Sequence, residues 1–140
     1  MVDYLFTRFA VHLDVAIGHE VLVRCLVYSP DNKWVATGSD DDTIILWTQD
    51  GRVSREWITR AGRIQSLAFS PDSRHLASAG DDQVAIWDLE RNIHQVTLLE
   101  SGAGGMYSCA WSYDGDMVAS ATYAGTVRLW DAHSFDLLHV

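Results

Sequence analysis

The sequence has few lysines and lacks a long hydrophobic run. Lys33 is the single lysine, and 19 acidic residues against ten basic ones give a formal net charge of −9. A negative field repels phosphate backbones, so we expect no nucleic-acid partner. No segment approaches the length of a membrane span, and Asp3, Arg8 and Asp14 interrupt the start of the chain. We therefore expect no membrane association and an intracellular protein, either cytoplasmic or nuclear.

Cysteine is also scarce. Only Cys25 and Cys109 are present, and they differ by one residue in their distance from the turn that follows each of them. Because side chains alternate along a strand, that offset places them on opposite faces. We therefore expect no disulfide between them. Isolated cysteines without metal-binding spacing are typical of small buried residues in a reducing compartment.

The dominant feature of the sequence is an internal repeat. The closing tryptophans of three similar segments, Trp47, Trp87 and Trp130, recur at intervals of about 40 residues, which is the length of one four-stranded propeller blade. The chain is 48% hydrophobic with six tryptophans, so it has ample apolar surface to bury. The segments read SPDNKWVATGSDDDTIILW from Ser29, SPDSRHLASAGDDQVAIW from Ser70, and SYDGDMVASATYAGTVRLW from Ser112.

Each repeat divides into four short strands separated by turn residues. Nearly continuous apolar runs in the first three strands indicate burial on both faces, whereas the fourth strand is more polar, as expected at an outer edge. The N-terminal stretch Tyr4–Ala16 fits a helix about as well as Phe9–Val15 fits a strand. The expected strands are Arg24–Ser29, Trp34–Gly38, Thr43–Trp47 and Val53–Ile58; Ile64–Ser70, His75–Ala79, Gln83–Trp87 and Gln95–Leu99; Tyr107–Ser112, Met117–Ala121, Thr126–Trp130 and Phe135–His139.

These segments resemble WD40 repeats. The resemblance rests on Gly18-His19, the Ser-Pro-Asp turns, and the Trp87-Asp88 and Trp130-Asp131 dipeptides, with Trp47-Thr48 as a departure in the first repeat. It implies an all-β fold of three four-stranded antiparallel blades. It also implies a structural hydrogen-bonded tetrad, which is complete in the first repeat as His19, Thr37, Asp41 and Trp47. The second repeat keeps the hydroxyl and indole of Ser78 and Trp87 with either Asp81 or Asp82, and the third keeps only Ser120 and Trp130.

Three repeats do not close a propeller, which has four to eight blades. We therefore expect an open, partial ring with repeats at about 18–58, 59–99 and 100–140, and an N-terminal segment 1–17 that could supply an outer strand for a missing blade. The two open blade faces predict self-association or completion by further blades, in a fragment of a larger propeller.

Other motifs do not support chemistry. His19-Glu20 begins a zinc-protease pattern, but Val23 stands where the second histidine is required. The run Asp40–Asp42 lacks the spacing of a calcium loop. No nucleophile, base and oxyanion donor occur at interpretable spacing, so we expect neither a cofactor, nor a metal, nor a catalytic residue.

The resemblance implies a non-catalytic scaffold that binds a protein or peptide on the face formed by the loops before the first strand and after the second. An acidic rim with aromatic residues predicts a basic or amphipathic segment as partner. The alternative is a structural or sensor role for these blades within a longer protein, such as a nucleotide-driven switch, and an enzyme is the third reading. The expected rim consists of Glu20, Asp40, Arg63, Asp82, Glu100, Tyr107 and Tyr123.

Overall fold

The computed structural model describes residues 18–81, 83–98 and 105–140, which form three antiparallel sheets of four strands each. Within each sheet the strands follow chain order. Blade one contains β1 (Val23–Tyr28), β2 (Trp34–Ser39), β3 (Thr43–Thr48) and β4 (Val53–Ile58); blade two contains β5 (Ser66–Phe69), β6 (His75–Ala79), β7 (Val84–Asp88) and β8 (Ile93–Leu98); blade three contains β9 (Met106–Trp111), β10 (Met117–Thr122), β11 (Val127–Asp131) and β12 (Leu137–His139).

The all-β prediction is confirmed. No helix occurs in residues 18–81, 83–98 and 105–140, so none in that part of the chain could cross a membrane. The observed strands β4 and β6 match the expected ranges, and most of the others shift by one or two residues at an end. The N-terminal segment 1–17, including the stretch within residues 4–16 whose sequence fits either a helix or a strand, lies outside the described residues.

The turn between the first two strands has the same construction in each blade. Its serine hydroxyl donates to the aspartate two residues later, at 2.6 Å from Ser29 to Asp31. The same hydroxyl accepts a hydrogen bond from the backbone amide of the first residue of the next strand. The residue after that aspartate takes a left-handed conformation, with φ of 59° at Asn32, 61° at Ser73 and 85° at Gly115. Asparagine, serine and glycine are turn residues that tolerate this backbone, which explains why the repeat keeps small or polar residues there.

Each blade has two distinct faces. The tryptophan face carries the hydroxyl and indole pair, Thr37 and Trp47 in blade one; the alanine face lies opposite and carries Ala36, Ala77 and Ala119 at equivalent positions. The pairing registers fix the equivalence, since alternate residues of paired strands share one side of the sheet.

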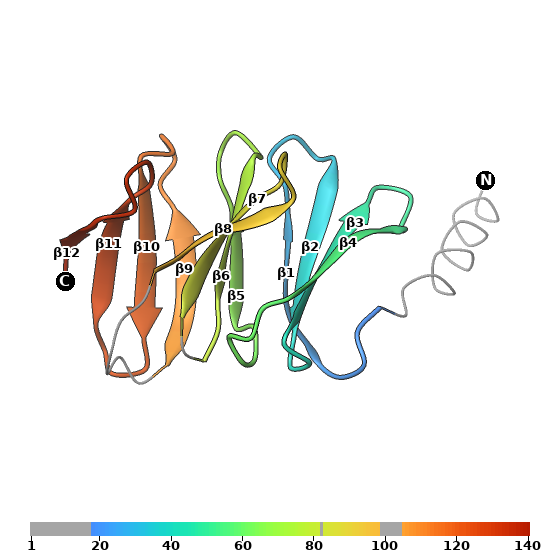
Figure 1. The fold of residues 1–140 in the computed structure, drawn as a ribbon, viewed down its shortest axis with the longest axis horizontal. Coiled ribbons are helices and arrows are strands. Elements are labelled where there is room, and N and C mark those ends of the chain that lie inside the picture. The colour runs from blue at the N-terminus through green and yellow to red at the C-terminus, as the bar shows by residue number, and fades with distance from the viewer. Residues whose placement is uncertain (1–17, 82, 99–104) are drawn as a thin grey trace, which may run out of the picture.

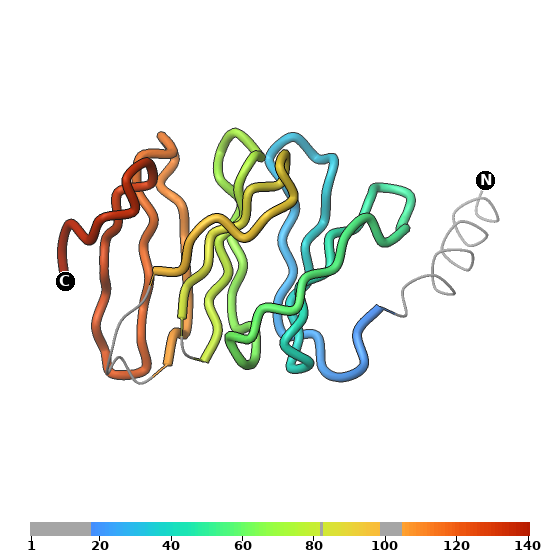
Figure 2. The backbone as a smooth tube through the Cα atoms, viewed as in Figure 1, coloured from blue at the N-terminus to red at the C-terminus, as the bar shows by residue number. Residues whose placement is uncertain are grey.

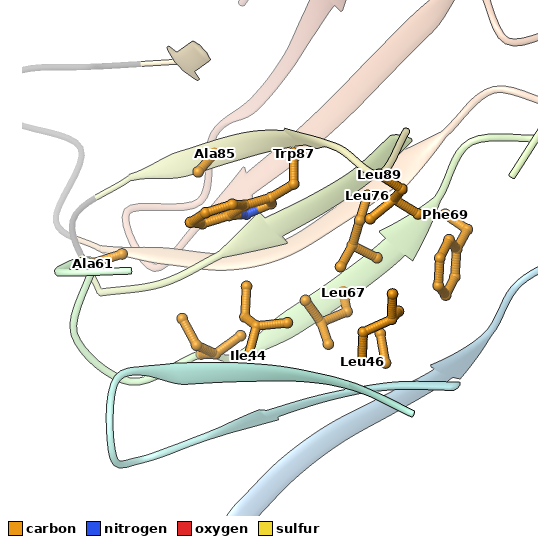
Figure 3. Packing of buried hydrophobic residues seen from close by; sticks show 11 residues of the cluster. Ile44, Leu46, Ala61, Leu67, Phe69, Leu76, Ala85, Trp87 and Leu89 are labelled. Carbon is orange, nitrogen blue, oxygen red and sulfur yellow. The ribbon is translucent and has the colours of Figure 1, made fainter. Parts of the chain in front are cut away.

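The core consists of two junctions in which the alanine face of one blade packs on the tryptophan face of the next. Figure 3 shows the first junction, where Ile44 and Leu46 of β3 face Leu67, Leu76 and Trp87 of blade two. The second junction packs alanine-face residues of blade two, among them Val84 and Ile86, against blade three. Strand β7 is buried along its whole length because it belongs to the middle blade, which has a neighbour on both sides.

The three sheets lie in a row and do not close a ring (Figure 1). The backbone tube shows blades one and three at opposite ends, with blade two between them (Figure 2). The predicted open wedge is therefore confirmed for the described residues. Within residues 18–81, 83–98 and 105–140, the tryptophan face of blade one and the alanine face of blade three have no neighbouring blade.

Candidate protein-interaction site

The structure brings the four residues expected to form the tetrad of blade one into a single hydrogen-bonded chain. Trp47 Nε1 donates to Thr37 Oγ1 at 2.8 Å, and His19 Nε2 lies 2.7 Å from the same hydroxyl oxygen. The other ring nitrogen, His19 Nδ1, lies 3.2 Å from Asp41 Oδ2. The chain ties the segment before β1 to β2, β3 and the turn between them, so it holds the loops at this end of the blade in place.

Asp41 is held in its charged form. Burial acts to raise the pKa of Asp41, but hydrogen bonds from the Thr43 hydroxyl and from the backbone amides of Glu20 and Thr43 outweigh it and lower the pKa to about 2. Thr43 also lies 2.9 Å from His19 Nδ1. Sequence reasoning missed Thr43; its place two residues after the aspartate, typical of a side-chain-capped turn, was the available signal.

The described part of the network is smaller in the other two blades. Trp87 Nε1 donates to Ser78 at 2.9 Å, and Trp130 Nε1 donates to Ser120 at 3.0 Å. The carboxylate of Asp81 contacts Gln65 Nε2 at 3.4 Å instead of entering a tetrad. Among the residues that the structure describes, only the hydroxyl and indole pair recurs in all three blades.

The two cysteines point into different junctions. Cys25 of β1 lies against the carbonyl of Ile64, and Cys109 of β9 lies against Ser66 and Ala77, so they approach blade two from its two sides. Both are free thiols. Burial raises the pKa of Cys25 to about 11 and that of Cys109 to about 12, which makes both poor nucleophiles.

A groove of about 550 Å³ opens where the inner strands of the three blades converge. Tyr107 and Tyr123, both expected in the rim, meet there with ring centroids 5.2 Å apart in an edge-to-face arrangement. Each of the two tyrosines is more than half exposed. The groove is lined by Leu22, Val23, Arg24, Gln65, Ser66, Tyr107, Ser108 and Tyr123.

Arginines partly neutralise the acidic groups next to the groove. Arg24 donates from Nη2 to Asp40 Oδ2 at 3.0 Å and also from Nε, and this contact lowers the pKa of Asp40. Arg63 Nε lies 3.9 Å from Asp81. Sequence reasoning overlooked Arg24, and the two ion pairs make this rim less acidic than the composition alone suggests.

The remaining rim residues do not all enter the groove. Glu20 is exposed beside the tetrad, where its backbone amide binds Asp41, and its side chain is not among the groove residues. Asp82 and Glu100 lie outside the described residues. Among the residues that the structure describes, no group of three or more histidine, cysteine or acidic side chains could hold a metal ion.

Comparison with known proteins gives the family. The model described as "WD domain, G-beta repeat" matches residues 11–48, 55–88 and 94–131. The small ribosomal subunit protein RACK1y of Oryza sativa subsp. japonica is 32% identical over 125 residues, which cover 84% of this chain and 37% of that protein. The ribosome biogenesis protein BOP1 of Rattus norvegicus is 43% identical over 51 residues, which cover 36% of this chain and 7% of BOP1.

Solved structures show the same fold. The structure of U3-55K superposes with a TM-score of 0.83 at 22% identity, and the WD40 repeats of RRP9 superpose with a TM-score of 0.81 at 24% identity. Each match covers 89% of this chain and 40% of the other, so the chain spans less than half the length of these proteins. With three repeats matched and three blades observed, the chain belongs to the WD-repeat family.

Proposed function

We propose that this chain is a non-catalytic intracellular scaffold that binds a protein or peptide at the groove between its inner strands. The observation that carries the proposal is the pair Tyr107 and Tyr123, two exposed aromatic rings in contact at a hollow to which all three blades contribute. Tyrosine supplies large contact area with few rotatable bonds, and it is enriched among residues that dominate binding energy.

A basic segment is the partner that fits the charge of the chain. The formal net charge is −9, and Asp40 keeps its charge because Arg24 lowers its pKa. A negative surface attracts and orients a positively charged partner, and it disfavours nucleic acid. The arginines at the groove restrict where a basic side chain can bind, so we expect the tyrosines to supply contact area and the surrounding carboxylates to speed association.

Binding of a short fluorescent peptide rich in arginine and lysine tests this function, with a glutamate-substituted peptide as reference. We expect Tyr107→Ala and Tyr123→Ala each to weaken binding of the basic peptide about tenfold, the loss of roughly 1.4 kcal/mol. Binding should also weaken as salt rises, because charges at the rim are screened over about 8–10 Å at physiological ionic strength.

Tyr113→Ala is the matched control. Tyr113 is 99% exposed and lies in the turn between β9 and β10, at the opposite end of β10 from Tyr123. We expect it to leave peptide binding unchanged, whereas Asp40→Lys should slow association. Equal binding of both peptides by all variants, at low and high salt, would contradict the proposal.

A structural role for these blades within a longer protein is the second candidate. The observation that favours it is coverage, since the chain spans 37% of RACK1y and 40% of each solved structure. Under this reading the groove is one part of a larger surface. Peptide binding by the 140-residue chain that depends on Tyr107 and Tyr123 would favour the scaffold.

A further inference from the structure

The open tryptophan face of blade one carries the same kinds of residue that the other two blades bury. Leu26 pairs with Thr37 as Leu67 pairs with Ser78 and Cys109 with Ser120, so these three residues occupy one structural position. Leu67 is 8% exposed and Cys109 is 7% exposed, but Leu26 is 65% exposed. An exposed leucine at a position that is buried elsewhere in the same chain indicates a contact surface without its partner.

The next position of β1 on the tryptophan face repeats the pattern. Tyr28 pairs with Val35 as Phe69 pairs with Leu76, and Tyr28 is 63% exposed where Phe69 is 7% exposed. Beside it lies a hollow of about 680 Å³, and no described blade fills it. The hollow is lined by His19, Val21, Val23, Tyr28, Asn32, Val35, Thr37, Trp47, Thr48, Gln49 and Gly51.

The alanine face of blade three carries the complementary surface. Val127 pairs with Ala121 as Ile44 pairs with Gly38 and Val84 with Ala79. Ile44 and Val84 are fully buried in the two junctions, whereas Val127 is 57% exposed. Ala119 likewise stands where Ala36 and Ala77 are fully buried. Blade three therefore presents the small and aliphatic residues that twice pack against a tryptophan face inside this chain.

We propose that a second copy of this chain docks head to tail, with the alanine face of blade three of one copy against the tryptophan face of blade one of the other. Both halves of the junction are present in each copy, and the chain builds that junction twice internally. The contact is heterologous, so two copies form a closed ring if the rotation allows it, and otherwise more copies add in a row. The proposal is independent of peptide binding, because Leu26 and Val127 do not line the tyrosine groove.

Sedimentation velocity of the 140-residue chain from about one to fifty micromolar tests the proposal. We expect the sedimentation coefficient to rise with concentration. Leu26→Asp removes one half of the junction and Val127→Asp removes the other, so each variant alone should associate at least tenfold more weakly. Mixing the two variants should restore a one-to-one complex, because each supplies the face that the other lacks.

Tyr113→Asp is the control, since it places the same charge on an exposed residue outside both faces, and it should associate like the parent. Circular dichroism at sub-micromolar concentration checks the fold of every variant, and Leu26→Ser with Val127→Ser replaces any aspartate variant that unfolds. A compact monomer throughout the range would overturn the proposal, because the faces would then be covered within one chain. If Leu26→Asp abolished association and Val127→Asp left it unchanged, the contact would be a symmetric one between tryptophan faces, and the proposal would be overturned. Association that neither substitution changes would overturn the proposal as well.

Discussion

At the scale of single residues, Asp41 is the group on which the blade-one network depends. Its carboxylate accepts from the Glu20 amide and from Thr43 and lies beside His19, so Asp41→Ala leaves several donors of this network without their acceptor. We expect it to lower the free energy of unfolding by about 1–3 kcal/mol. Asp40→Ala is the matched control: it removes a partly exposed ion pair with Arg24, a change of about 0–1 kcal/mol. Equal losses for the two variants in denaturant melts would refute this assignment.

The same carboxylate predicts acid sensitivity. The pKa of Asp41 is about 2 in the folded chain and near 3.8 when the group is unperturbed, so the folded state favours the charged form. Its contribution to stability is present above pH 4 and is lost as the pH falls toward 2. From the pKa difference, with allowance for solvent screening, we expect about 1–2 kcal/mol. Unfolding measured between pH 5 and pH 2 should show a shallower decline for Asp41→Asn, and an unchanged slope would disagree with this view.

At the scale of strands and sheets, the junctions require small residues at defined places. A methyl group on Gly38 would overlap the side chain of Ile64 and lie 2.9 Å from Cys25 Sγ. We expect Gly38→Ala to cost about 1–3 kcal/mol through overpacking. Ala121 occupies the same position on the open face of blade three, so Ala121→Val should change stability by less than about 0.5 kcal/mol in dilute solution. Thermal melts that penalise both variants alike would argue against an open face there.

The strands were predictable because local chemistry defines them. Pro30-Asp31 and Pro71-Asp72 mark the turns, and β-branched and aromatic residues fill the intervals, so β4 and β6 match their expected ranges. The shift in register at Trp47, Trp87 and Trp130, where the third strand pairs with the fourth, was not predictable. Pairing irregularities depend on contacts between strands, which a pattern along one strand does not contain.

The site was less predictable than the fold for the same reason. The contact between Tyr107 and Tyr123 joins two separate strand ends, and the pairing of Arg24 with Asp40 joins β1 to a turn. Composition gave the sign of the charge on the chain, but the ion pairs that reduce it at the rim depend on three-dimensional neighbours.

At the scale of the whole molecule, stability follows the number of neighbours that each blade has. Among the described residues, blade two has a neighbouring blade on both faces, whereas blades one and three each have a neighbouring blade on one face. In repeat proteins the total stability is approximately a sum of the intrinsic stabilities of the repeats and the interface terms between them. Blade three also has a smaller described network than blade one, since Trp130 bonds only to Ser120 among the tetrad positions described, so we expect blade three to open most readily.

Backbone hydrogen exchange followed by mass spectrometry, at sub-micromolar concentration, tests most directly whether the blades stabilise one another through their repeated faces. We predict the slowest exchange in β6 and β7 of the middle blade, faster exchange in β2 and β3, and the fastest among the inner strands in β10 and β11. At tens of micromolar, added protection should appear in β1, β2, β10 and β11 as the outer faces become covered. Equal protection of all three blades at every concentration, or greatest protection in blade three, would contradict the account.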